Sequence, residues 1–335
     1  MGLQTLAWPQ RACPGAGGPD VVRARRSDPA NHSPDAGLAP PDRHTPGFQP
    51  VDLDAYLQRI GIPRRCAPDL AFLRRMHRAH LRTIPYENLD VLLGRELSVD
   101  SDRAFDKLVR GGRGGWCFEM NALFAGALEA AGYRVRILAS VIKRDRRNRS
   151  EEGVHPLVLI DLDQPYVADV GFGDGLREPI PLRSGLYRQG RLNFRLEPLD
   201  TEWWRLHNHE NASIPYYDFT LEPVDRARLL TASEWLRTSS ASPHLRNAVC
   251  QRHLDGGMVL LLGRGLCRLQ DERTTVHLLD GADAYVASLR RVFGIDCPEA
   301  AALWPRICAQ HEEIDAEATL RASGNTFRAR LKDAG

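Results

Sequence analysis

"RGGRGGWCFEMNALF" (residues 110–124) joins a segment rich in glycine and arginine to one cysteine, Cys117, and then to a run typical of a helix. Gly132 is a natural C-terminal cap, so the pattern predicts a helix from Cys117 or Phe118 to about Ala131. The Gly114–Gly115 pair would let the backbone turn sharply into this helix. The predicted buried stripe comprises Met120, Phe124, Ala127, Leu128 and Ala131. Cys117 is then a buried core thiol, a metal ligand or a nucleophile.

Two further helices are predicted before this stretch. Residues 53–60 and residues 70–84 both carry apolar side chains at helical spacing, and Pro85 ends the second run. His77 and His80 lie three residues apart on the second helix, as a metal-binding pair would. No third ligand lies nearby, so core or surface histidines are the favoured interpretation.

The pattern changes to strands after residue 133. Short runs rich in β-branched residues and bounded by turn residues cover 134–142, 154–162 and 165–172. The charged run 143–153 between the first two is interpreted as a solvated hairpin loop, with an anion site as the alternative. Further strands are predicted within 194–199, 218–224, 256–263, 266–270 and 274–279, and helical segments within 233–249, 281–295 and 301–323.

Composition excludes several classes of protein. The 335 residues are 43% hydrophobic and carry a formal net charge of only +2, which does not favour binding to nucleic acid or to an anionic membrane. No apolar run approaches the roughly 20 residues of a membrane helix, and no signal-peptide core is expected. The seven cysteines form no CxxC pair, so neither a zinc site nor a disulfide framework is expected and a reducing cytoplasm is predicted.

Nucleophilic chemistry at Cys117 requires the thiolate. Three features would each lower the pKa of the thiol: the free N–H groups at the start of a helix, the nearby Arg113, and a histidine from elsewhere in the fold. His155 and Asp169 lie on consecutive predicted strands, and an odd number of loop residues places them on one face, either directly opposite or as diagonal neighbours. Asp169 could then orient His155, which faces the thiol.

Each of these residues also has a structural interpretation. A single cysteine is usually a core residue, His155 precedes Pro156 as a strand-end residue would, and Asp169 could form a turn. Taken singly, each residue favours the structural interpretation, whereas the three together favour catalysis. Papain-like proteases and transglutaminases arrange the same three roles, so the set alone does not fix the reaction.

At this point the sequence resembles a known family. "RGGWCFEMNALF" is similar to the active-site signature of the arylamine N-acetyltransferases, and "DLDAYLQRIGI", "IPYENLD" (84–90) and "DVGFGD" (169–174) resemble further blocks of that family. "SEWLRTSSASPHLRN" resembles a later block that usually has Phe where this chain has His244. The resemblance runs from about residue 49 to the end, and the 38-residue separation of Cys117 and His155 agrees with it.

The resemblance implies roles for particular residues. Cys117 would be the nucleophile that accepts the acyl group, His155 the general base and Asp169 its orienting carboxylate. Arg113 and Glu87 would form a structural ion pair. The pocket for the acyl group and the amine would be lined by Tyr86, Phe118 and Phe172.

The resemblance also implies an α+β fold of several domains with a cysteine-protease-like Cys-His-Asp core. The expected parts are a disordered Pro-rich extension (1–48), a helical bundle carrying the nucleophile (49–133), a central antiparallel β-barrel carrying His155 and Asp169 (134–232), an interdomain helix or linker (233–260), and a C-terminal α/β lid (261–335). The long vertebrate insertion between Phe172 and Ser233 is missing, so a bacterial-type enzyme is expected.

The implied activity is a ping-pong transfer from acetyl-CoA to an arylamine, arylhydrazine or arylhydroxylamine, a reaction of xenobiotic metabolism, through an acetyl-cysteine and without a metal. The expected partners are these small molecules, with neither nucleic acid nor membrane, and the enzyme would be a cytoplasmic monomer or homodimer. Two alternatives stay open: an amide synthase that closes a macrolactam in ansamycin-type polyketide biosynthesis, and a non-catalytic binding module.

Overall fold

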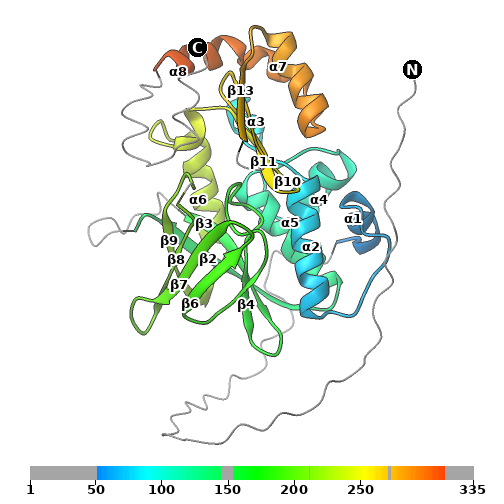
Figure 1. The fold of residues 1–335 in the computed structure, drawn as a ribbon, viewed down its shortest axis with the longest axis vertical. Coiled ribbons are helices and arrows are strands. Elements are labelled where there is room, and N and C mark those ends of the chain that lie inside the picture. Colours follow the sequence, from blue (N-terminus) through cyan, green and yellow to red (C-terminus); the bar gives the residue numbers. More distant parts are fainter. Residues whose placement is uncertain (1–50, 145–153, 211, 271–272, 314–335) are drawn as a thin grey trace, which may run out of the picture. The chain divides into compact units, whose positions relative to one another are not determined.

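The computed structural model describes residues 51–144, 154–210, 212–270 and 273–313, so the predictions for residues 1–48 and for the charged run from 145 to 153 lie outside it. The described residues belong to one compact unit, which combines helices with two antiparallel sheets (Figure 1). The predicted α+β class is therefore confirmed. None of the described helices is long and apolar enough to span a membrane.

The first part of the chain is mainly helical. Its elements are α1 (Leu53–Arg59), α2 (Leu70–Thr83), β1 (Tyr86–Glu87), α3 (Leu89–Leu92), α4 (Ser101–Phe105), the π-helical turn η1 (Asp106–Arg110) and α5 (Cys117–Ala130). Local signals account for their ends: the side chain of Asp69 accepts a hydrogen bond from the N–H of Phe72 at the start of α2. Gly132 follows α5 with φ of 94°, as its predicted capping role requires.

The larger sheet has eight strands in the order β5-β4-β3-β2-β9-β8-β7-β6. Their bounds are β2 (Arg134–Ile142), β3 (Val154–Asp161), β4 (Pro165–Ala168), β5 (Ile180–Pro181), β6 (Gly185–Gln189), β7 (Leu192–Pro198), β8 (Trp203–His207) and β9 (Tyr216–Pro223). The Gln189 side chain at one edge bonds to the backbone N–H of Arg177 and Glu178, just before the opposite edge strand. The sheet therefore curls into a nearly closed barrel, as predicted for the centre of the fold.

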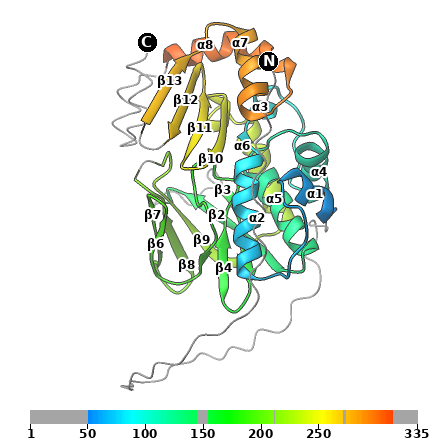
Figure 2. The same ribbon diagram turned by 45° about the vertical axis from the view of Figure 1, so that its right-hand side comes forward.

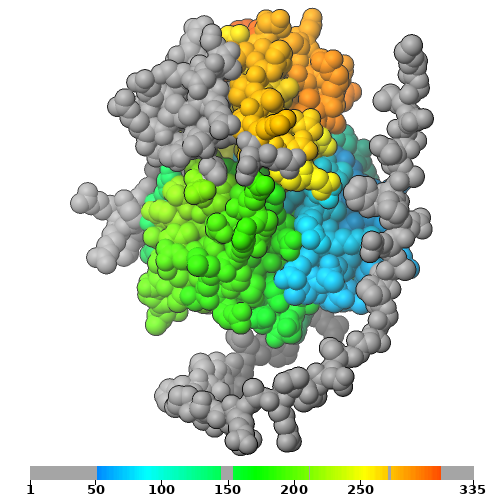
Figure 3. Space-filling model, viewed as in Figure 1, coloured from blue at the N-terminus to red at the C-terminus, as the bar shows by residue number. Residues whose placement is uncertain are grey.

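The smaller sheet has five strands in the order β1-β10-β11-β12-β13, and helices cover one of its faces (Figure 2). The elements that follow the barrel are α6 (Arg226–Thr238), η3 (Pro243–Leu245), β10 (Val249–Leu254), β11 (Gly257–Leu262), β12 (Gly265–Gln270), β13 (Arg273–Leu278), α7 (Ala282–Ser288), η4 (Leu289–Phe293), η5 (Pro298–Leu303) and α8 (Trp304–Glu313). This sheet begins at β10, inside the segment 233–260 that was expected to be a linker, and it recruits β1 from the helical part. The space-filling view shows the barrel residues, in green, and the helical residues, in blue, meeting in one surface (Figure 3).

Helix α5 lies in the middle of this arrangement and packs against β2 and β3. The sequence predicted one buried stripe, but every residue from Cys117 to Leu128 is buried. The difference arises because α5 has the barrel on one side and the other helices on the other. Its two polar positions in this stretch, Glu119 and Asn121, are buried too, and both take hydrogen-bond partners.

Candidate active site

Cys117 is the first residue of α5, as the sequence predicted, and its side chain is 4% exposed. Gly114 and Gly115, which precede it, allow close packing and do not have the positive φ of a special backbone turn. A Cβ at Gly114 would lie 2.3 Å from the carbonyl oxygen of Pro85, and Gly115 exchanges backbone hydrogen bonds with Pro85 and Glu87. The sharp-turn explanation is therefore replaced by the close approach of two backbone segments.

Buried ion pairs hold this approach in place. The guanidinium of Arg113 lies 2.6 Å from the carboxylate of Glu87 and 3.1 Å from that of Asp90. Lys107 in turn contacts Asp90 and Glu119, each at 2.8 Å. The expected pair of Arg113 and Glu87 is present, and it belongs to a network that joins η1, α3 and the start of α5.

His155 and Asp169 come together across the hairpin of β3 and β4. The strands pair Asp161 with Pro165 and Val158 with Ala168, which makes His155 and Asp169 diagonal neighbours on one face, one of the two registers that the parity argument allowed. His155 Nε2 donates to Asp169 Oδ2 over 2.7 Å, because the ionised carboxylate can only accept. The Nδ1 atom of His155 is therefore left with its lone pair.

The carboxylate of Asp169 has three other donors. Asn121 Nδ2 lies 3.0 Å and the Gly171 N–H 2.9 Å from Oδ1, while the hydroxyl of Tyr217 lies 3.2 Å from Oδ2. Burial raises the pKa of Asp169, but His155 and these donors outweigh burial and the pKa is lowered overall. Asp169 is thus held ionised inside the protein.

Two of these donors were missed in the sequence. Asn121 is four residues after Cys117 on the same helix, so helical spacing could have placed it on the same face. Tyr217 comes from β9, which reaches this point only through its pairing with β2. No local signal identifies Tyr217.

The Cys117 thiol is protonated in the resting protein. Burial raises its pKa, the charge of Asp169 adds to this effect, and the backbone N–H groups of Phe118 and Cys117 oppose it. The N–H groups at the helix start therefore lower the pKa as expected, but burial outweighs them and the pKa is raised overall. Arg113, which was expected to stabilise the thiolate, forms ion pairs with Glu87 and Asp90 instead.

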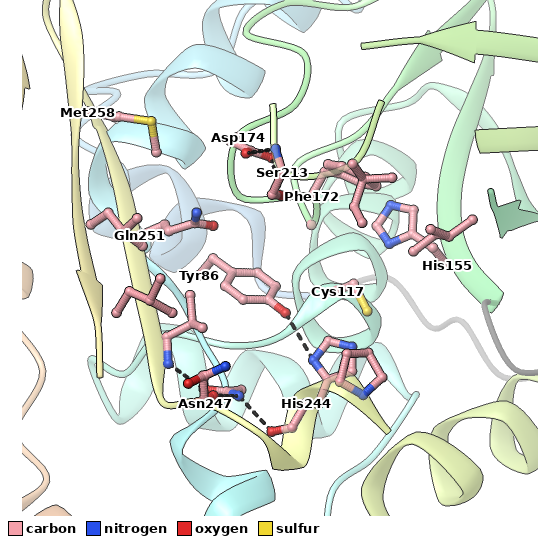
Figure 4. A pocket seen from close by; sticks show the side chains of 18 of the residues that line it. Tyr86, Cys117, His155, Phe172, Asp174, Ser213, His244, Asn247, Gln251 and Met258 are labelled. Atoms are coloured by element: carbon pink, nitrogen blue, oxygen red, sulfur yellow. Dashed lines mark hydrogen bonds between the residues drawn. The ribbon is translucent and has the colours of Figure 1, made fainter. Parts of the chain in front are cut away.

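Cys117 and His155 line a cavity of about 770 Å³ (Figure 4). Tyr86 and Phe172 line it as expected, and the ring of Phe172 lies edge-on to His155 with centroids 4.9 Å apart. Phe118 is not among the described residues that line the cavity. It is 2% exposed and packs on Trp116, because the second residue of α5 points back into the helical core.

His77 and His80 are buried core histidines, as their favoured interpretation had it. His77 uses both ring nitrogens on backbone groups, with Nδ1 donating to Arg177 O and Nε2 accepting from the N–H of Asp169. His80 Nδ1 lies 2.8 Å from the Tyr56 hydroxyl. Both ring nitrogens of His77 are thus bonded, whereas Nε2 of His80 is buried without a hydrogen-bond partner among the described residues.

His244 also lines the cavity, at the position where the sequence departs from the family pattern. Its ring is edge-on to Trp116 with centroids 5.5 Å apart, and its Nδ1 lies 3.4 Å from the hydroxyl of Tyr86. A second imidazole therefore lies close to the start of α5.

Comparison with known proteins gives a consistent result. A family model described as N-acetyltransferase matches residues 69–302. The arylamine N-acetyltransferase of Escherichia coli K12 is 31% identical over 254 residues, which cover 74% of this chain and 90% of that protein. The enzyme of Mycolicibacterium smegmatis is 32% identical over 254 residues, covering 73% and 92%.

Solved structures agree with this similarity. The structure of the Mycobacterium marinum arylamine N-acetyltransferase in complex with CoA has a TM-score of 0.69 and 27% identity, with 78% of this chain and 99% of that chain covered. That of the M. smegmatis arylamine N-acetyltransferase has a TM-score of 0.70 and 30% identity, covering 77% and 98%. The described fold is thus shared with these proteins.

Proposed function

This chain belongs to the arylamine N-acetyltransferase family, whose members are acyltransferases, and on that premise we propose that it moves an acetyl group from acetyl-CoA to an arylamine, arylhydrazine or arylhydroxylamine. The transfer proceeds by a ping-pong mechanism through acetyl-Cys117. The observation that carries the proposal is the 2.7 Å bond of His155 to a fully buried Asp169 beside the cavity that contains Cys117.

In the first half-reaction Cys117 attacks the thioester carbonyl of acetyl-CoA. Because the resting thiol is protonated, its proton moves to Nδ1 of His155 as the carbon–sulfur bond forms. Asp169 stabilises the imidazolium, and N–H groups at the start of α5 stabilise the oxyanion. The tetrahedral intermediate then expels CoA, which takes the proton from His155.

The second half-reaction repeats these steps with the amine as nucleophile. The amine nitrogen attacks the acetyl carbon, its proton passes to His155, and the Cys117 sulfur leaves and is protonated again. Tyr86 and Phe172 flank the cavity and suit a flat aromatic acceptor. A weakly basic aromatic amine is neutral at pH 7 and keeps the lone pair that this attack needs.

The relatives described above do not favour the macrolactam-forming amide synthase, because they carry the N-acetyltransferase name. One relative, from Salmonella typhimurium, is named an arylamine N-acetyltransferase and N-hydroxyarylamine O-acetyltransferase. That name supports including arylhydroxylamines among the proposed acceptors. A binding module has no need of the ionised Asp169 that His155 contacts.

Intact-protein mass spectrometry after mixing with acetyl-CoA tests the proposal. We expect one acetyl group on the wild type and on Cys66→Ala, which removes a partly exposed thiol, and none on Cys117→Ala. Adding an arylamine should then remove the group and release the N-acetylated amine. Labelling of Cys117→Ala, no labelling of a folded wild type, or an acetyl group that no arylamine removes would contradict the mechanism.

A further inference from the structure

His244 is held rigidly beside the nucleophile. It lies in the short turn η3, where the side chain of Asn88 bonds to the carbonyl oxygens of His244 and Asn247, at 2.9 Å and 2.8 Å. The N–H of His244 donates to the hydroxyl of Ser242 over 3.2 Å. Its ring packs edge-on against Trp116, the residue directly before Cys117. In the view of Figure 4, Cys117 lies between the imidazole rings of His155 and His244.

The two ring nitrogens of His244 have different surroundings. Burial raises the pKa of Tyr86 well above its usual value, so this phenol stays protonated and has a proton to donate to Nδ1 of His244, 3.4 Å away. When Tyr86 donates this bond, the proton of the neutral imidazole is on Nε2. Nε2 has no hydrogen-bond partner among the described residues. It is not one of the buried unpaired imidazole nitrogens, which among those residues belong to His80, His209 and His253. It is therefore free to bond to a group in the cavity.

His244 is uncharged at neutral pH. Burial lowers its pKa to about 4, and the neighbouring His155 adds to this effect. No carboxylate of the described residues bonds to His244 as Asp169 bonds to His155, so His244 is a poor proton acceptor. A neutral N–H in a fixed position can instead stabilise negative charge that develops on an oxygen, without repelling the imidazolium that forms at His155.

We propose that His244 is a catalytic residue whose Nε2–H donates a hydrogen bond to the acyl oxygen of the tetrahedral intermediate on Cys117. The inference rests on the proposed acetyl transfer. When the nucleophile attacks, the electron pair of the carbonyl π bond moves to this oxygen, and it returns when the leaving group departs. The proton stays on Nε2 throughout. Both half-reactions pass through such an intermediate, so both use the same donor.

The test is the single-turnover rate of Cys117 acetylation by acetyl-CoA in three variants. His244→Gln places an amide N–H near the position of Nε2, whereas His244→Asn reaches only the position of Nδ1 and His244→Phe keeps a flat ring without a donor. We expect His244→Phe and His244→Asn to lose about 100-fold in this rate, the effect of removing one oxyanion donor, and His244→Gln to lose less than about tenfold. The apparent KM for acetyl-CoA should change little, because the bond strengthens only in the transition state.

Three outcomes would overturn the inference alone: wild-type rates in His244→Phe, equal losses in His244→Gln and His244→Phe, or a loss confined to KM. A folded wild type that forms no acetyl-Cys117 would instead overturn the proposed function and this inference together. Thermal unfolding midpoints of the three variants, compared with the wild type, identify any loss that comes from misfolding.

Discussion

Two histidine–aspartate pairs lie beside the same cavity, and they are bonded in different ways. In the first, Nε2 of His155 contacts the carboxylate of Asp169 at 2.7 Å. In the second, Nε2 of His209 contacts the backbone carbonyl of Asp174, also at 2.7 Å. The carboxylate of Asp174 accepts instead from the N–H and hydroxyl of Ser213. The residue types are the same, but only the first pair joins an imidazole to a charged group.

The electrostatic consequences are opposite. Burial raises the pKa of both carboxyl groups, but at Asp169 the imidazole and three further donors lower it overall, whereas at Asp174 burial wins and the pKa is raised. An imidazole beside an ionised carboxylate is stabilised when it gains a proton. At His209 burial lowers the pKa of the imidazole, and it outweighs the opposing effects of the Asp174 charge and of the bond to the Asp174 carbonyl. The contact with a carboxylate therefore suits His155 to accept a proton, whereas the contact with a backbone carbonyl suits His209 to a structural role.

Replacing the carboxylate of each pair in turn by an amide should separate the two pairs most strongly. Asp169→Asn should lose about 10³ to 10⁴-fold in kcat/KM for acetyl transfer, because the amide no longer stabilises the imidazolium or fixes its tautomer. Asp174→Asn should lose less than about tenfold, or about 1.4 kcal/mol, because the carboxylate of Asp174 bonds to Ser213 and to no imidazole among the described residues. Steady-state kinetics per folded protein measures both variants. Near-normal turnover in Asp169→Asn, or equal losses in the two, would remove the distinction.

A second prediction concerns the histidines whose rings contact backbone carbonyls. Burial lowers the pKa of His253 to about 3, and its Nε2 donates to Gly173 O. In the unfolded chain the imidazole has its ordinary pKa of 6.5. Below that pH the unfolded chain binds a proton that the folded protein does not bind, so acid lowers the free energy of unfolding. The wild type should lose about 1.4 kcal/mol of unfolding free energy per pH unit through this group, or about 2 kcal/mol between pH 6.5 and pH 5. His253→Gln should not show this part of the loss.

Urea unfolding at pH 7, 6 and 5 measures this pH dependence, with the exposed His277→Gln as the matched control. The slope with pH is the quantity compared, because the substitution also changes contacts that do not depend on pH. Parallel slopes for the wild type and His253→Gln would show that this imidazole is not held neutral.

The hydroxyl of Tyr217 should contribute least to the pair of His155 and Asp169. Tyr217→Phe removes one of the four donors to the Asp169 carboxylate and leaves the ring in place. The net value of one such bond is about 1 kcal/mol, so kcat/KM should fall about fivefold. Tyr133→Phe is the control, because it removes a hydroxyl that bonds to Asp69 O, away from the cavity. A loss as large as that of Asp169→Asn would mean that Tyr217 has a direct role in the reaction.

Much of the fold could be read from local patterns. The helices at 53–59, 70–83 and 117–130 and the strand at 134–142 follow from apolar periodicity and end signals. The strands at 185–189, 203–207 and 249–254 were not predicted. Most of their side chains are only partly buried, so the pairing of neighbouring strands specifies them more than their own hydrophobicity does.

The candidate site divides in the same way. The spacing of residues on one hairpin was enough to predict that His155 and Asp169 share a face, because side chains alternate strictly along a strand. The motif around Cys117 was enough to place the thiol at the start of a helix. Both features depend on short-range geometry.

The packing of distant segments decides the remaining features. Burial between the barrel and the helices keeps the Cys117 thiol protonated, turns Phe118 away from the cavity and brings His244 next to Trp116. Desolvation and ring contacts depend on every segment that surrounds a residue, and these segments lie as far as 128 positions apart along the chain in the case of Trp116 and His244. A local pattern therefore names the groups that can react, whereas the folded chain sets their protonation and their neighbours.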